Sequence, residues 1–95
     1  MIKVTAEFVL QPGSYDKVIE IADELIQLTR REDGCISYEL AKSDEDENVL
    51  MMFETWRDQD ALDAHSSSAH FTSLVPKIAS LCVSAPVVKS FFQII

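Results

Sequence analysis

The segment Val49–Trp56 constrains the fold most, because it is apolar on both faces of the strand that its sequence predicts. Alternate side chains of a strand point to opposite faces. One face carries Val49, Met51 and Phe53, and the other carries Leu50, Met52 and Trp56. Two apolar faces indicate a strand that packs on helices on one side and on something else on the other.

Apolar patterns along the chain give the order of the other elements. Period-two alternation predicts strands over residues 2–10 and 35–41, and a last strand is expected over 87–95. Helical spacing predicts a helix over 15–31 and a broken helix over 58–65 and 71–81. This order is that of an α+β, ferredoxin-like split βαβ sandwich, with a four-stranded antiparallel sheet and helices on one face. The 95 residues are expected to form one domain, 1–95.

Several local signals refine these elements. Ser14 and Asp58 are predicted N-caps, since their side-chain oxygens accept from free backbone N–H groups. The three serines at 66–68 favour a break between two helices. Pro76 predicts a kink or a late start in the second of them. The second strand is expected to place Ile36, Tyr38 and Leu40 on one face, and Cys35, Ser37 and Glu39 on the other.

The face of the sheet without helices requires a cover of its own. We expect this face to expose Leu50, Met52, Phe91 or Phe92 in an isolated chain. Hydrophobic residues make up 47% of the sequence, which is a surplus for a domain of this size. A homodimer through the sheet face is the simplest arrangement that buries them.

Charge and composition exclude several classes of protein. The net charge of −8 repels phosphate backbones, so nucleic acid is not an expected partner. No apolar run of about 18 residues and no secretory signal is apparent, which predicts a soluble cytoplasmic protein without a membrane partner. Cys35 and Cys82 are interpreted as small buried hydrophobic residues rather than as a disulfide or a nucleophile.

The candidate site is the region that holds His65 and His70, the only two histidines, near Trp56, the only tryptophan. Histidine is the side chain whose ordinary pKa makes it a proton carrier near neutral pH. His65 is therefore the predicted catalytic base, with packing at its helix end as the alternative. Tyr38, Phe53, Trp56, Phe71 and His70 are predicted to bind substrate, although each also suits the core or the solvent-exposed surface.

Metal binding is not predicted from this pair of histidines. On a continuous helix, residues five apart lie about 140° from each other, so both imidazoles would not face one ion. No third ligand stands at metal-site spacing. Glu54 is the one acid expected to be buried, either with a partner such as Arg57 or Lys89 or with a raised pKa.

Three stretches of the chain together resemble a known family: EDGCISYEL at 32–40, FETW at 53–56 and HSSSAHF at 65–71. The first is similar to the E-P-G-C-x-x-Y-x-L stretch of the antibiotic biosynthesis monooxygenase family, with Asp33 where that family often has proline. Nearly the whole chain resembles this family. The resemblance implies a dimeric α/β barrel of two sheets packed face to face, with a pocket between sheet and helices in each subunit.

The resemblance also implies a range of activities. Some members oxidise polyphenols or quinols without metal or flavin, others isomerise small metabolites, and others open haem. The haem-opening members use an asparagine on the first strand with a tryptophan and a histidine on the helices. This chain has Ala6 and Glu7 near the first position and His65 near that tryptophan, so haem degradation is not expected.

Our leading hypothesis is a small cofactor-independent monooxygenase that oxidises an aromatic phenol or quinol with O2. An isomerase of a small oxygenated metabolite, in which His65 moves a proton between adjacent carbons, is the second hypothesis. A non-enzymatic ligand-binding dimer module is the third. A cavity lined by His65 would favour the two enzymes, whereas a cavity filled by Trp56 and Phe71 would favour the binding module.

Overall fold

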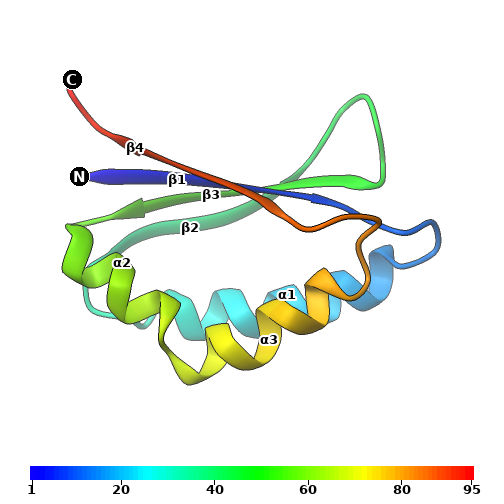
Figure 1. Cartoon of the computed structure of the whole chain (residues 1–95), viewed down its shortest axis with the longest axis horizontal. Coiled ribbons are helices and arrows are strands. Elements are labelled where there is room, and N and C mark those ends of the chain that lie inside the picture. Colours follow the sequence, from blue (N-terminus) through cyan, green and yellow to red (C-terminus); the bar gives the residue numbers. More distant parts are fainter.

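The four strands form one antiparallel sheet, and the three helices pack against one of its faces (Figure 1). The computed structural model describes all residues, 1–95. Its elements are, in order, β1 (Ile2–Val9), α1 (Tyr15–Thr29), β2 (Cys35–Lys42), β3 (Val49–Trp56), α2 (Gln59–Ser66), α3 (Ala69–Ala79) and β4 (Val87–Phe92). The strand order is β2-β3-β1-β4, and every neighbouring pair is antiparallel. The predicted ferredoxin-like α+β fold is confirmed, with a sheet that stays open within the single chain.

The main core lies between the central strands and the helices. Ile2, Val4, Ala6 and Phe8 of β1 all point inward, and none is more than 6% exposed. Their partners across the β1–β3 ladder extend the same face, because Ala6 pairs with Met52 and Ile2 with Trp56. Val18, Ala22 and Leu25 cover this layer from α1, at the helical spacing that the sequence shows.

The expected residues of the uncovered face need correction. Leu50 and Met52 lie under the helices and are each 1% exposed, so their predicted place on the uncovered face is wrong. Both faces of this strand are apolar, so its pattern alone does not fix which face meets the helices. Phe53, 47% exposed, and Phe91, 53% exposed, occupy the uncovered face. Phe92 pairs with Ile2 and so lies on the helix side, at an edge that no helix covers.

A β-bulge changes the predicted faces at the start of β2. Cys35 pairs with Trp56 and Ser37 with Thr55, which leaves Ile36 as the extra residue. Cys35 therefore packs against the core, whereas Ile36 is exposed. Beyond the bulge the alternation is as predicted, and Tyr38 points inward.

The helix boundaries confirm some local predictions and correct others. Asp58 caps α2, since its Oδ1 accepts from the backbone N–H of Ala61 at 2.9 Å. Ser14 makes no side-chain cap, because its own backbone is already helical rather than extended. The serine break is confirmed, and Ser68 caps α3. A late start at Pro76 is wrong, because α3 begins at Ala69 and continues through this proline.

The ends of the elements complete this description. β4 stops at Phe92, three residues before the predicted end of the strand. The acidic segment 44–47 lies in the exposed β2–β3 connection, as its charge predicts. No helix of the fold has the length and apolar character that a membrane crossing requires.

Candidate active site

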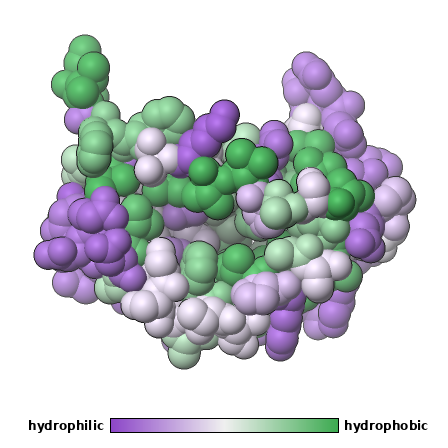
Figure 2. All heavy atoms as spheres, in the orientation of Figure 1, coloured by the Kyte–Doolittle hydropathy of each residue, from purple (hydrophilic) through white to green (hydrophobic).

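A cavity lies between the inner face of the sheet and the helices. Its empty volume, including the open mouth, is about 530 Å³, and 10 of its 14 lining residues are hydrophobic. Figure 2 shows a hollow between the sheet layer and the helix layer, with hydrophobic side chains along its rim. Small-molecule sites are typically apolar cavities with a few polar groups, and this one matches that description.

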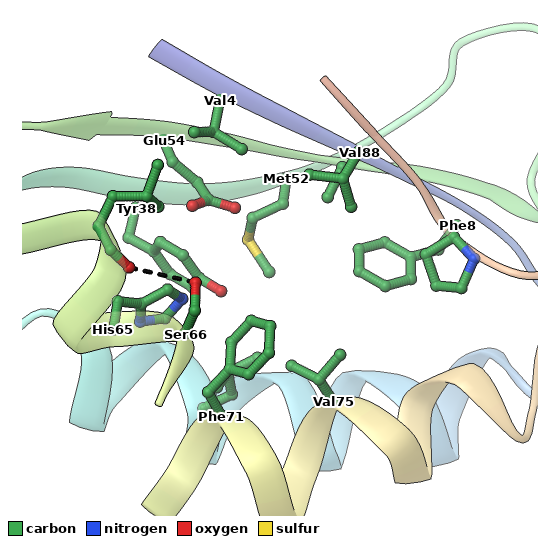
Figure 3. A pocket seen from close by; sticks show the side chains of 14 residues that line it. Val4, Phe8, Tyr38, Met52, Glu54, His65, Ser66, Phe71, Val75 and Val88 are labelled. Atoms are coloured by element: carbon green, nitrogen blue, oxygen red, sulfur yellow. Dashed lines mark hydrogen bonds between the residues drawn. The ribbon is translucent and has the colours of Figure 1, made fainter. Parts of the chain in front are cut away.

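The polar groups of the cavity come from both layers. Tyr38 and Glu54 reach in from neighbouring strands, whereas His65 and Ser66 come from the last turn of α2 (Figure 3). The remaining wall is aliphatic or aromatic and includes Phe8, Met52, Phe71, Val75 and Val88. The cavity therefore favours a ligand that is largely apolar and has one or two polar atoms.

His65 is the most tightly held polar side chain of the site. It is 1% exposed, and its ring lies 4.5 Å from the Trp56 ring, centroid to centroid. Nδ1 lies 2.6 Å from Oε2 of Glu32, whereas Nε2 is buried and has no hydrogen-bond partner. Burial lowers the pKa of His65, and Glu32 partly opposes that shift. A neutral ring that donates Nδ1–H to Glu32 keeps its lone pair on Nε2, the form that a general base needs.

Glu32, in the turn after α1, contacts both histidines. The same Oε2 lies 2.9 Å from Nε2 of His70, in the first turn of α3. Gly34 allows this turn to approach α2, because it has φ +86° and an added Cβ would stand 2.5 Å from Ala61 Cβ. The turn thus holds the Glu32 carboxylate within hydrogen-bond distance of His65 Nδ1.

This cluster corrects the geometric argument against a shared metal ion. That argument assumed a continuous helix, whereas the break between α2 and α3 turns His65 and His70 toward the same carboxylate. A third group of ligand type is also present, namely Glu32. The ligand atoms of the three side chains lie within 4.8 Å of one another.

Glu54 is a second acid–base group at the cavity. It is 7% exposed, and Trp56 donates its Nε1–H to Glu54 Oε1 at 2.9 Å. Burial raises the pKa of Glu54 to about 7, against the lowering effect of the Trp56 hydrogen bond, and the charge of Glu32 raises it further. The partner is thus Trp56 rather than the predicted Arg57 or Lys89, and the predicted raised pKa is confirmed.

Tyr38 completes the polar set. Its side chain is buried, and its ring contacts those of Trp56 and His65 edge-on. Burial, followed by the charges of Glu54 and Glu32, raises the pKa of the Tyr38 hydroxyl. This hydroxyl therefore remains protonated at neutral pH and is available as a hydrogen-bond donor.

The structure separates the predicted site residues into three groups. Tyr38, His65 and Phe71 line the cavity as predicted. Trp56 and His70 lie in the layer behind it, where they contact Glu54 and Glu32. Phe53 lies on the opposite face of the sheet, because its position in β3 is one residue out of phase with Met52 and Glu54. Phe53 therefore forms no part of this cavity.

Three polar residues of the site and most of its apolar wall were not predicted as site residues. Glu54 was expected only to be buried. Glu32 entered only as the first letter of the EDGCISYEL stretch, and Ser66 only as part of the helix break. A signal for Glu32 was present in the nearby Gly34, since a glycine after a helix permits the tight turn that folds an acidic residue back on the structure.

The family model of antibiotic biosynthesis monooxygenase matches residues 1–77 of the chain. The chain belongs to this family. The match covers both central strands, α2 with His65 and most of α3, and thus most of the candidate site.

Relatives and solved structures agree with this assignment. "Putative monooxygenase YcnE" of Bacillus subtilis is 34% identical over 86 residues, which cover 90% of each protein. "Uncharacterized protein sll1783" of Synechocystis is 29% identical over 90 residues, and the match spans 95% of this chain but only 61% of that protein. A crystal structure described as antibiotic biosynthesis monooxygenase has a TM-score of 0.93 at 33% identity, with 99% of each chain covered. Family and relatives together indicate a monooxygenase-like function.

Proposed function

We propose that the protein is a cofactor-independent monooxygenase that oxidises a small aromatic phenol or quinol with O2. The observation that carries this proposal is the unpartnered Nε2 of His65 at the wall of an apolar cavity, with Nδ1 fixed by Glu32. The family of the chain supports the same reaction class.

The first step is removal of the phenolic proton. Nε2 of His65 accepts this proton, and the imidazolium that results is stabilised by the Glu32 carboxylate 2.6 Å from Nδ1. The phenolate that forms is electron-rich and lies against a mostly apolar wall. The Tyr38 hydroxyl is available to donate a hydrogen bond to the phenolate oxygen.

The second step is reaction of the phenolate with O2. A ring carbon that carries hydrogen, ortho or para to the oxygen, bonds to one oxygen atom, and O2 gains the two electrons of that new bond. The peroxide anion takes back the proton held on Nε2 of His65 and becomes a hydroperoxide. The hydroperoxide then loses its terminal oxygen as water, together with the hydrogen of the same ring carbon. The overall reaction converts the phenol and O2 into a quinone and H2O, so no external reductant is required. The aromatic and aliphatic wall, including Phe71, holds the planar ring during these steps.

Oxygen uptake tests this proposal. The purified protein is assayed with reduced naphthoquinols and polycyclic phenols, and the rate is corrected for spontaneous autoxidation. His65→Asn is the informative variant, because the Asn amide replaces Nδ1 toward Glu32 but leaves nothing in place of Nε2. We expect a rate at least about 100-fold lower in this variant and an unchanged rate in Lys77→Gln, an exposed position on α3. Equal rates in His65→Asn and the unmodified protein would reject His65 as the base.

An isomerase remains the second candidate, favoured by one observation. Glu54 and His65 both face the cavity, and burial raises the pKa of Glu54 to about 7, so the cavity holds a carboxyl group that exchanges protons near neutral pH beside an imidazole. An isomerase converts its substrate equally well without O2. Conversion that continues under nitrogen would therefore replace the oxygenase with the isomerase.

We further propose that a second copy of the chain covers the open face of the sheet. Phe53, Val87 and Phe91 lie on this face, and each is at least 47% exposed. Sedimentation velocity is expected to give a dimer for the unmodified protein and for Phe53→Leu. Phe53→Asp places a charge in the contact and is expected to give a monomer with an intact fold by circular dichroism. A monomeric unmodified protein at micromolar concentration would contradict this arrangement.

A further inference from the structure

We propose that Glu32, His65 and His70 form a binding site for a divalent transition-metal ion of the zinc type, behind the wall of the cavity. Oε2 of Glu32, Nδ1 of His65 and Nε2 of His70 lie within 4.8 Å of one another. Binding at this cluster does not depend on the oxygenase reaction proposed above. Only the expected effect of the ion on His65 as a base depends on that reaction.

The ligand set selects the class of ion. Two imidazoles and one carboxylate suit zinc and neighbouring transition metals, which accept nitrogen and oxygen together. Calcium and magnesium prefer sites made of oxygen atoms alone. Three protein ligands also leave a fourth position for water, as in many zinc sites with three side-chain ligands.

The present distances show how small a change the ion requires. Oε2 now accepts from both rings, at 2.6 Å from His65 and 2.9 Å from His70. A bound zinc ion lies about 2.1 Å from each ligand atom, which separates neighbouring ligands by roughly 3.4 Å in a tetrahedron. The carboxylate therefore has to move away from the rings by about 1 Å, and the two ring nitrogens, now within 4.8 Å of each other, have to approach by up to about 1.4 Å. Glu32 lies in a turn and His70 in the first turn of α3, so neither is held in the middle of an element.

Burial of the cluster is graded from the cavity to the surface. The exposed fractions of the side chains are 2% for His65, 15% for Glu32 and 17% for His70. An ion can thus enter from the side of Glu32 and His70 without passing through the cavity. The net charge of −8 also favours the approach of a cation.

Metal binding at Nδ1 changes what His65 offers to the cavity. A neutral imidazole has one N–H, and coordination through Nδ1 moves that proton to Nε2. Nε2 then donates a hydrogen bond and no longer accepts a proton. In the proposed oxygenase, whose base is this nitrogen, an ion at the cluster acts as an inhibitor.

A cobalt titration of the full chain tests the site directly. Co²⁺ bound by two imidazoles and a carboxylate is expected to give visible absorption that saturates at one ion per chain, and Zn²⁺ is expected to displace it. Glu32→Gln and His70→Gln retain hydrogen-bonding side chains but should weaken binding at least about 100-fold. Cys35→Ser and Asp44→Asn are the controls, since they remove a nearby thiol and an exposed acid, and both should bind as the unmodified protein does.

Several outcomes would overturn the proposal. These are the absence of saturable binding at 1:1, equal affinity in Glu32→Gln and His70→Gln, and loss of binding in Cys35→Ser. ¹⁵N spectra of the histidine rings provide a readout independent of activity, and they should show the His65 proton on Nδ1 before zinc and on Nε2 after it. Oxygen uptake then separates the two proposals. Absence of uptake before zinc is added counts against the oxygenase alone, whereas uptake that zinc leaves unchanged counts against the inhibitory role.

Discussion

The two faces of the central strand β3 differ in what they contact, although the sequence makes both apolar. Met52, Glu54 and Trp56 point toward the helices, and each is at most 7% exposed. Phe53, between them in sequence, points the other way and is 47% exposed. The inward positions belong to the core and to the wall of the cavity, whereas the outward ones belong to a surface without helices (Figure 1).

The two faces of β3 therefore differ in composition as well as in exposure. The covered face combines apolar packing with a buried acid, Glu54, at the wall of the cavity. The open face carries exposed apolar side chains such as Phe53 and Phe91 beside polar ones such as Lys3 and Thr55. Large exposed apolar side chains are typical of a surface that meets another protein. The two apolar faces of β3 therefore have different surroundings. A residue of this strand has to be assigned to one face before a role is proposed for it.

The largest expected difference between the faces is in stability. Trp56 is fully buried at 0% exposure, so Trp56→Ala should lower the free energy of unfolding by about 3–5 kcal/mol. Phe53→Ala should cost less, and its cost should depend on protein concentration, because in the proposed dimer this side chain contacts the second copy of the chain. Urea unfolding at two protein concentrations, about 20-fold apart, measures both effects. A concentration-independent loss of similar size for the two variants would remove the distinction.

The covered face should also impose a pH dependence through Glu54. The pKa of Glu54 is raised from 4.5 to about 7 in the folded chain, so the folded state holds a proton that the unfolded state has released. Stability therefore falls as pH rises from about 4.5 to about 7, and the full penalty, up to about 3 kcal/mol, applies above that range.

Glu54→Gln tests this linkage, because the amide stays neutral and can still accept from Trp56. Its free energy of unfolding should exceed that of the unmodified protein at pH 8 and match it near pH 4.5. Glu39→Gln on the open face is the matched control, since Glu39 pairs with Phe53 and is exposed. It should leave the pH profile unchanged. Parallel pH profiles for Glu54→Gln and the unmodified protein would refute the assignment.

Much of the fold could be predicted because local patterns agree with it. Alternation in β1 identifies its buried face correctly, and helical spacing identifies α1 and its inward residues. The errors lie where pattern alone is insufficient. The bulge at Ile36 depends on how β2 pairs with β3, and the faces of β3 depend on which side the helices cover.

The candidate site was predictable only in part, for a related reason. His65 and Tyr38 are recognisable by residue type and by their place on regular elements. Glu32 lies 33 positions from His65 and reaches it through a turn, so no spacing in the sequence links the two. His65 and His70 were expected to point in different directions because a continuous helix was assumed across the three serines. Those serines themselves predicted a break, and the structure has two helices there.

The smallest expected change in stability comes from loss of a hydrogen bond on the open face. Lys3 Nζ donates to Thr55 Oγ1 on the open face at 2.9 Å, the same length as the bond from Trp56 to Glu54 on the covered face. Lys3→Met keeps the stem but removes the donor. Since the ammonium of an exposed lysine regains water when the bond is lost, the change should stay within about 1 kcal/mol. Thermal unfolding at two salt concentrations measures it. A loss above about 2 kcal/mol would mean that the open face depends on its polar contacts as the covered face does, and that burial does not separate the two.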